Sequence, residues 1–572
     1  MRLVFDIETD NFVDSMTKIH CIAVQDLDSD FTKSYKPDEI DEAINTLANA
    51  DVLIGHNIIG FDLKAIKKIY PDFVEKNVID TLVISRLVYS GLKDKDFIDR
   101  HDGMPLKLYG SHSLKAWGHR LSEYKDEYEG GFEEYNEDML KYMEQDVVVT
   151  RKLYDNLIEK QPAKHALRVE HDIAYVCADI EETGFVFDKK AAAELYGELS
   201  QKRDEISNKM AETFEPKVIQ LKTKTKVIPF NPSSRQQIAD ALINKYNWKP
   251  KHLTPKGSPK IDENILNDLD YPEAQMLSEY FMLEKRLAML ADGDQGYLKL
   301  VDKNNLLRGR YIPNGAVSGR ATHFGPNMAQ VPSMRLPFGK EIRSCFTVPA
   351  GWRLVGVDLS GLELRCLAHY ASHWDNGAYT KAVLDGDIHT SNQEAAGLPT
   401  RDSAKTFIYS LIYGAGDAKL GEVIGKGRDS GKAIREKFFA SMPAIKQLRN
   451  AVIEKFETQN HLLGLDERKL FPRSSHSALN ILLQSAGAVI SKQWLINARK
   501  DLKTQGFSHG WGADYVFSAW VHDEVQVAVR EGKEEDVGNI IRRSAQKAGE
   551  DFEFRCRIDA DFSVGRSWAT TH

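Results

Sequence analysis

The sequence has few cysteines and no long apolar run. Its five cysteines are scattered along 572 residues, odd in number and never spaced as zinc-binding pairs. That usage favours free thiols in a reducing compartment over a disulfide framework. No apolar stretch approaches the ~20 residues that a bilayer requires, and the opening MRLVFDIETD lacks the apolar core of a signal peptide. We therefore expect a cytoplasmic protein without a membrane segment.

The sequence also lacks a basic excess, since its net charge is −8. This argues against wholesale coating of nucleic acid but permits binding in a cleft, because local clusters set the field there. Lysines gather in KVIQLKTKTK (217–226) and KPKHLTPKGSPK (249–260), and ordinary solvated side chains would explain either stretch. A hydrophobic content of 42% suits large globular cores, and the length predicts about four domain-sized units.

The first third places carboxylates where a mixed sheet flanked by helices would bring them together. Residues 3–9 alternate as a strand, which puts Asp6 and Glu8 on one face. Asp62 opens a helical run in GHNIIGFDLKAIKKIY. A further expected strand, a helix and another strand occupy residues 21–27, 39–50 and 51–57.

Tyr142 and Asp146 extend this set, because they lie at i and i+4 on one face of a predicted helix. A lone Asp-x-Glu pair is weak evidence, but four carboxylates with a tyrosine are the set needed to hold two divalent cations about 3.5–4 Å apart around a phosphodiester. Tyr142 would orient the attacking water. Asp80 lies near them in the sequence, and whether its role is structural stays open. The set resembles that of 3′→5′ proofreading exonucleases with an RNase H-like fold: Asp6, Glu8, Asp62, Tyr142 and Asp146.

The stretch WVHDEVQV (520–527) has two adjacent carboxylates in a run otherwise typical of a buried strand. We expect a hairpin with His522-Asp523-Glu524 as its tight connection. Burial of adjacent like charges is costly unless a cation compensates, so the alternative is a polar tip in water. A second acid favours the metal site, because residues 354–357 predict a buried strand that delivers Asp358 at its end.

The stretch RDSAKTFIYSLIYGAG predicts a helix that ends at Gly414. Two cations and then two aromatics follow one stripe of this helix, a suitable cradle for a triphosphate with a base beyond it. An exposed amphipathic helix is the alternative. The stripe consists of Arg401, Lys405, Tyr409 and Tyr413.

Together these three motifs resemble family A DNA polymerases, the class typified by bacterial polymerase I, and in particular the replicative polymerases of short-tailed phages. The stretches PNGAVSGRATH, DGDIHTSNQEAA, HSALNILLQSAGA and the terminal WATTH are also similar to that branch. The resemblance implies an α/β and α+β multidomain fold, with an RNase H-like exonuclease domain before a right-hand polymerase domain. The implied segments are an exonuclease domain at 1–156, a connector and the start of the palm at 157–190, the thumb at 191–300, the palm at 301–370, the fingers at 371–480 and the palm again at 481–572.

By this resemblance the protein adds dNTPs to a primer 3′ end and proofreads the product, with two Mg²⁺ ions in each active site and Mn²⁺ as an acceptable substitute. The polymerase ions would be held by Asp358, Asp523 and the carbonyl of Leu359. Glu524 would support that site. Asp6, Glu8, Asp62 and Asp146 would hold the ions of the exonuclease site.

The resemblance also assigns the incoming nucleotide. Arg401, Lys405 and His389 would hold the triphosphate, and Lys405 could protonate the leaving pyrophosphate. Glu363 would close the space that a ribose 2′-hydroxyl needs. Tyr409 implies ready acceptance of dideoxynucleotides, because its hydroxyl can replace the missing 3′-hydroxyl contact.

For DNA, the resemblance puts Tyr413 and Gly414 where the templating base enters. Arg320, Gln484 and His522 would contact the minor-groove edge at the primer end. Some members of the branch carry a long thumb insertion that binds thioredoxin. The interval 215–235 is too short for that platform, so thioredoxin is not expected. Our hypothesis is that three lysines of this interval grip duplex phosphates directly, Lys222, Lys224 and Lys226.

The expected partners are primer-template DNA and dNTPs, for a monomer that replicates a phage genome in the host cytoplasm. A helicase-primase and a single-strand-binding protein are possible further partners. Three alternatives stay open: a nuclease whose polymerase half is idle, a non-catalytic replisome scaffold, and a single-subunit RNA polymerase. Glu363 and the N-terminal carboxylates disfavour the last of these.

Overall fold

The computed structural model describes residues 1–123, 128, 130–220 and 225–572. The chain forms two compact units. The first comprises Met1–Glu182, Tyr311–His323 and Val355–Ser563, and the second Thr183–Arg310, Phe324–Leu354 and Val564–His572. Lys222 and Lys224 lie outside the described residues, as does the side chain of Lys226. No helix in the described ranges is both long enough and apolar enough to cross a membrane.

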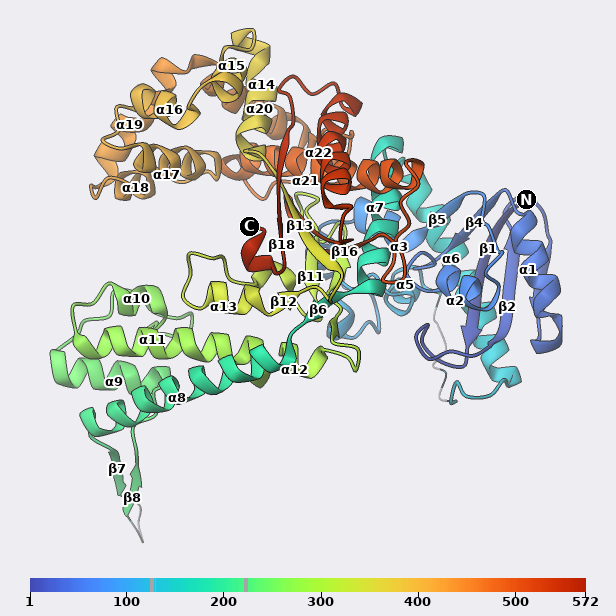
Figure 1. Ribbon diagram of the computed structural model, residues 1–572, viewed down its shortest axis with the longest axis horizontal. Coiled ribbons are helices and arrows are strands. Elements are labelled where there is room, and N and C mark those ends of the chain that lie inside the picture. Colours follow the sequence, from blue (N-terminus) through green and yellow to red (C-terminus); the bar gives the residue numbers. More distant parts are fainter. Residues whose placement is uncertain (124–127, 129, 221–224) are drawn as a thin grey trace. The chain divides into compact units, whose positions relative to one another are not determined.

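The N-terminal part of the first unit is built on a five-stranded mixed sheet, as expected (Figure 1). Its order is β3-β2-β1-β4-β5, with β1 antiparallel to β2 and parallel to β4. The strands are β1 (Arg2–Thr9), β2 (Ile19–Asp26), β3 (Thr32–Tyr35), β4 (Val52–Gly55) and β5 (Val78–Asp80). The helices are α1 (Ile40–Asn49), α2 (Asp62–Ile69), α3 (Thr81–Val88), α4 (Leu92–Asp99), α5 (Leu114–Arg120), α6 (Glu137–Glu159) and α7 (Lys164–Thr183).

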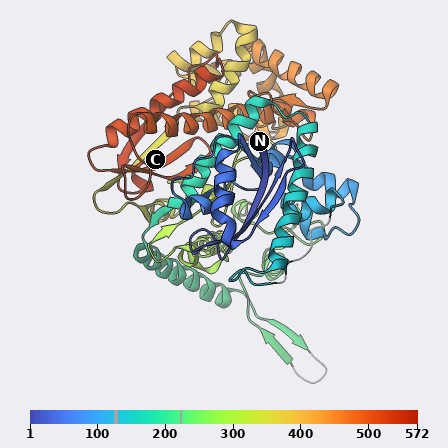
Figure 2. The same cartoon turned by 90° about the vertical axis from the view of Figure 1, so that its right-hand side faces the viewer.

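Alternation along β1 gives the two faces of this sheet different partners. Leu3 and Phe5 are buried in the cluster that contains α1 and α2. Val4 is buried on the opposite face, in the cluster that contains Met143 of α6. Helices accordingly flank the sheet on both sides in Figure 2. Because Asp6 and Glu8 follow Val4 at intervals of two, they lie on the α6 face.

A second sheet in the first unit has the order β16-β17-β13-β18. Its strands are β13 (Trp352–Leu359), β16 (Tyr515–Val521), β17 (Glu524–Arg530) and β18 (Ala560–Gly565). Val521 pairs with Glu524, so His522 and Asp523 form the tight turn of the expected hairpin. His522 has φ +59°, the left-handed conformation that such turns require.

Helices and one short hairpin complete the first unit. They are α14 (Leu362–Asp375), α15 (Ala378–Asp385), α16 (Ile388–Ala396), α17 (Arg401–Ile412), α18 (Asp417–Glu422), α19 (Arg428–Ser441), α20 (Pro443–Gln459), β14 (Leu462–Leu463), β15 (Lys469–Leu470), α21 (Ser475–Thr504) and α22 (Glu534–Asp551). Helix α21 is apolar or small around much of its circumference, which is typical of a buried helix. Its Trp494 is fully buried together with Phe407 of α17 and Phe517 of β16.

The second unit contains helices around a core that includes Phe214, Leu242 and Leu277. Its helices are α8 (Lys189–Thr213), α9 (Arg235–Tyr246), α10 (Glu263–Asn267), α11 (Pro272–Leu287), α12 (Tyr297–Leu300) and α13 (Gly339–Ser344). A three-stranded sheet joins β12 (Phe346–Thr347), β6 (Phe185–Phe187) and β9 (Leu306–Leu307). The short strands β10 (Arg310–Ile312) and β11 (Thr322–Phe324) pair with each other and lie mostly in the first unit.

The interval 215–235 contains two strands that were not predicted from the sequence. It begins with an antiparallel hairpin of β7 (Lys217–Gln220) and β8 (Thr225–Ile228). Val218 pairs with Val227 across the hairpin, and both side chains are exposed. β-branched residues in both arms favour strands, a signal that the lysines of this interval obscured.

Candidate functional site

The N-terminal carboxylates converge between β1 and α6. Each of Asp6, Glu8 and Asp146 offers a carboxylate oxygen within 4.8 Å of the others. Among the described residues, no other histidines, cysteines or carboxylates form such a group of three or more. Tyr142 lies one turn before Asp146 on α6, half-buried, with its ring 5.6 Å from that of Tyr128. The strand and helix periodicities predicted this convergence correctly.

Asp62, the first residue of α2, is buried beside this group. The pKa of its carboxyl is raised to about 8, mainly by burial and in addition by the Asp80 and Glu8 carboxyls, while backbone hydrogen bonding from Asp62 and Ile7 opposes the rise. Its Oδ1 atom is buried without a hydrogen-bond partner. A buried carboxylate in this state is stabilised by a cation. These residues therefore fit divalent metal ions.

Asp80 has a structural role, which resolves the question left open by the sequence. Its carboxylate accepts hydrogen bonds from the backbone N–H groups of Leu82 at 2.9 Å, Asn57 at 2.8 Å and Ile59 at 3.1 Å. The first of these caps helix α3. The other two fix the loop that leads to Asp62.

The C-terminal acids meet where β13 ends beside the β16–β17 turn. The backbone N–H of Leu359 donates to the carbonyl of Asp523 at 2.9 Å, which joins the two segments directly. Asp358 is exposed next to this hydrogen bond. Burial raises the pKa of Asp523; Arg320 opposes the rise, while the Glu363 and Glu524 carboxyls add to it. The carboxylates of Asp358 and Asp523 and the backbone carbonyl of Leu359 thus lie on adjacent segments.

Hydrogen bonds from Trp520 and Ser491 hold the turn that carries Asp523 in place. The carbonyl of His522 accepts hydrogen bonds from Trp520 Nε1 at 3.0 Å and from Ser491 Oγ of α21. Glu524 is buried at the start of β17, where its Oε1 accepts from Gln526 Nε2 at 2.7 Å. The expected hairpin is confirmed. The burial of Glu524 is compatible with the expected role of supporting the site without binding a metal ion directly.

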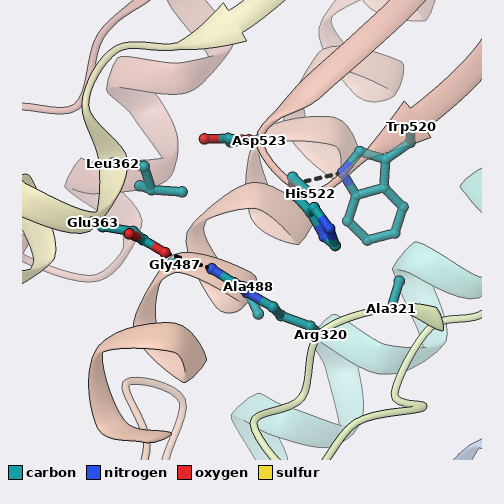
Figure 3. Close-up of a pocket in the computed structure, with 9 residues that line it drawn as sticks. All are labelled: Arg320, Ala321, Leu362, Glu363, Gly487, Ala488, Trp520, His522 and Asp523. Atoms are coloured by element: carbon teal, nitrogen blue, oxygen red, sulfur yellow. Dashed lines mark hydrogen bonds and ion pairs between the residues drawn. The ribbon is translucent and has the colours of Figure 1, made fainter. Parts of the chain in front are cut away.

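Glu363, at the start of α14, links two elements beside the same acids. Its carboxylate accepts from Arg320 Nη2 at 3.0 Å and from the Tyr413 hydroxyl at 2.7 Å. Figure 3 shows the pocket that Arg320, Glu363, His522 and Asp523 help to line. Burial and Arg320 lower the pKa of His522. The contact between Tyr413 and Glu363 was not anticipated, because the two residues are 50 positions apart.

Helix α17 presents the expected stripe. Arg401 and Lys405 are exposed on its first turns, and the rings of Tyr409 and Tyr413 are stacked 6.4 Å apart at 26°. His389 lies 6.3 Å from the Tyr409 ring, and burial, Arg401 and Lys405 lower the pKa of His389. Such a group offers donors to an anion in front of two aromatic faces.

The helix ends as the sequence predicted. Ile412 is its last residue, and Gly414 follows with φ +77°. The sequence did not identify Asp387 as the partner of Arg401, which donates to its Oδ2 at 2.7 Å and thereby lowers the pKa of Asp387. Gln484 lies half-buried on α21.

Comparison with known proteins places these motifs in one family. Residues 197–570 match the family model described as DNA polymerase family A. The DNA-directed DNA polymerase of Escherichia phage T7 is 36% identical over 707 aligned positions that cover all of both chains. The chain belongs to DNA polymerase family A. The DNA-directed DNA polymerase of Enterobacteria phage T3 has the same identity and coverage, so the resemblance to phage members of the family is confirmed.

The family A fold is also found in a solved structure. The POL domain of Pol1 from M. smegmatis, in complex with DNA primer-template and dNTP, superposes with a TM-score of 0.78 at 17% identity. The match covers 100% of this chain and 95% of that chain. At such low identity the likeness shows the fold alone. The alignment with the phage T7 protein is longer than this family A chain, so that relative contains segments absent here.

Proposed function

We propose that this family A protein is a DNA-directed DNA polymerase that extends a primer 3′ end from dNTPs. The observation that carries the proposal is the hydrogen bond from Leu359 N–H to Asp523 O, which brings Asp358 and Asp523 together at the ends of the neighbouring strands β13 and β17. The conjunction of these acids with the cation and tyrosine stripe of α17 supports nucleotidyl transfer. Phage relatives named as DNA-directed DNA polymerases over their full length support the same activity.

The polymerase residues have complementary roles in this proposal. Asp358, Asp523 and the Leu359 carbonyl would hold two Mg²⁺ ions, for which Mn²⁺ could substitute. When bound, the ions would activate the primer hydroxyl and neutralise the leaving pyrophosphate. Arg401 and Lys405 would bind the triphosphate, with Lys405 as proton donor to the leaving group. The exposure of both cations on α17 is consistent with that role.

Residues around Glu363 would select the substrate. Glu363 would exclude a ribose 2′-hydroxyl, and its hydrogen bonds from Arg320 and Tyr413 would hold it in place for that purpose. Arg320 and His522 line one pocket beside Asp523, which suits contacts to the minor-groove edge of the primer end. Primer-template DNA and dNTPs are the proposed ligands. The segment assignment as palm, fingers and thumb belongs to the same proposal.

We further propose a 3′→5′ exonuclease site at Asp6, Glu8, Asp62 and Asp146. The convergence of Asp6, Glu8 and Asp146 on the α6 face of the five-stranded mixed sheet, with Asp62 buried near Glu8, supports an RNase H-like domain and a site for two metal ions. The carboxylates would position the cations on the scissile phosphodiester. Tyr142, one turn from Asp146, would orient the attacking water by a hydrogen bond.

Primer extension on a long single-stranded template tests both activities. Asp523→Asn should abolish extension and leave excision of a mismatched primer intact. Asp146→Ala should do the reverse. Extension by the Asp523→Asn variant at the wild-type rate would refute the polymerase site. Excision without extension by the wild-type protein would favour the alternative of a nuclease with an idle polymerase half, and a protein with neither activity would favour the replisome scaffold.

A further inference from the structure

Helix α7 presents the imidazole of His171 to the backbone of Asp80 at the end of β5. His171 Nε2 lies 2.9 Å from the backbone nitrogen of Asp80, and His171 Nδ1 lies 2.7 Å from the carbonyl oxygen of Leu167. A backbone N–H can only donate and a carbonyl can only accept. His171 is therefore neutral, with its proton on Nδ1 and its Nε2 acting as an acceptor.

Asp80 connects His171 to the loop that precedes Asp62. With its backbone held by His171, its carboxylate holds the N–H groups of Asn57 and Ile59. Asn57 has φ +65°, and the Phe61 N–H closes a turn onto its carbonyl at 3.0 Å. A loop with a non-glycine residue in the left-handed region keeps its shape only where surrounding contacts fix it. Asp62 comes directly after this turn.

We propose that His171 is a positioning residue of the excision site. It fixes Asp80, and through Asp80 the loop at residues 57–61, so that Asp62 is presented to cations held with the other carboxylates. The inference rests on the proposed exonuclease function. It also means that the site depends on α7, which lies beyond the segment 1–156 expected to contain it. His171 acts through Asp80 and is not itself a catalytic residue.

Side-chain length provides the decisive test. A glutamine at position 171 puts an acceptor oxygen at the ε position, where Nε2 now lies, whereas an asparagine puts one only at the δ position. The variants His171→Gln, His171→Asn and His171→Leu are compared in the full chain. His165→Leu is the control, because His165 is an exposed histidine on the same helix.

The first measurement is hydrogen–deuterium exchange in metal-free protein. Amides of residues 57–63 and 80–82 should exchange faster in the Asn and Leu variants than in wild type, and the Gln variant should restore most of the protection. Excision should fall about 10- to 100-fold in the Asn and Leu variants, the range expected when a residue that orients metal ligands is lost. In the same two variants, the Mg²⁺ concentration required for half-maximal excision should rise. Extension of a matched primer should stay at the wild-type rate in every variant, which also shows that they fold.

Wild-type exchange and excision in the Leu variant would overturn the proposal, and so would equal effects of Gln and Asn. If His171→Leu does not fold, the Gln and Asn variants alone decide between the outcomes. The variant Asp146→Ala separates this inference from the function on which it rests. Unchanged excision by Asp146→Ala would refute the exonuclease site itself. Loss of excision by Asp146→Ala, together with wild-type excision by His171→Asn, would refute only the role of His171.

Discussion

The substitution Glu170→Gln should destabilise the protein because it breaks a buried group of four compensating charges. Glu170 of α7 accepts hydrogen bonds from Arg468 at 2.6 Å and from Lys492 of α21. Arg468 also pairs with Asp466 at 2.6 Å. The four side chains are at most 2% exposed. Two cations and two anions therefore balance one another out of water, and the loss of one anion leaves a cation uncompensated.

The magnitude follows from the two ion pairs that Glu170 makes. Burial lowers the pKa of Lys492 to about 8, and Glu170 is the main group that opposes this. Without Glu170 the lysine becomes neutral near pH 7, so its added cost is limited to about 1.4 kcal/mol, the free energy of one pKa unit. Arg468 loses a charged hydrogen bond, worth about 1.5–3 kcal/mol. The sum of about 3–4 kcal/mol agrees with the cost of breaking a buried ion pair, about 3–5 kcal/mol.

Thermal unfolding at pH 7 measures this effect. Glu170→Gln should lower Tm by about 6–16 °C, given about 2–4 °C per kcal/mol for large domains. Addition of Lys492→Met removes one charge of each sign and should recover at least half of the loss. Glu436→Gln is the control, because its ion pair with Lys432 is exposed and contributes under about 1 kcal/mol. A wild-type Tm for Glu170→Gln, or a double variant less stable than the single one, would refute the reasoning.

Three further predictions concern single residues. The lowered pKa of Lys492 means that the folded state binds fewer protons than the unfolded state between pH 8 and 10.5. The free energy of unfolding of the wild-type protein, relative to that of Lys492→Met, should therefore rise across that window in denaturant titrations. A difference that does not change with pH would contradict this prediction. Gly414→Ala should destabilise α17 and slow extension, because a Cβ would meet the His476 carbonyl oxygen at 2.6 Å where φ is +77°. Hydrogen exchange of the α17 amides measures the destabilisation, and wild-type protection of these amides would count against the prediction. Tyr409→Phe should reduce incorporation of dideoxynucleotides in a competition assay with dNTPs, and an unchanged ratio would exclude the proposed role of the hydroxyl.

Elements with strong periodicity could be predicted from the sequence. Alternation in residues 3–9 gave the common face of Asp6 and Glu8, and the positive φ of Gly414 matches the expected helix end. These features depend on local backbone geometry, which nearby residues determine. The hairpin β7–β8 was missed because the lysines beside its Val and Ile residues were interpreted as solvated side chains or as phosphate contacts.

Several parts of the candidate sites could not be predicted because they depend on contacts between distant residues. Tyr413 donates to Glu363 across 50 positions. Glu170 meets Lys492 across 322 positions. Neither pair has a local pattern, since a buried charge is satisfied by whichever partner the packing brings near. The structural role of Asp80 became evident only from the backbone N–H groups around its carboxylate.

By itself, the sequence identified the candidate site residues and the strand, helix or turn that holds each one. Asp358 at the end of a buried strand and Asp523 in a hairpin turn followed from composition and periodicity alone. Only the tertiary structure decided that β13 lies beside β17, so that Leu359 and Asp523 share a hydrogen bond. It also decided that α7 places His171 against the backbone N–H of Asp80, whose carboxylate holds the loop before Asp62. The physical reason is range: backbone preference acts over a few residues, whereas burial selects partners from anywhere in the chain.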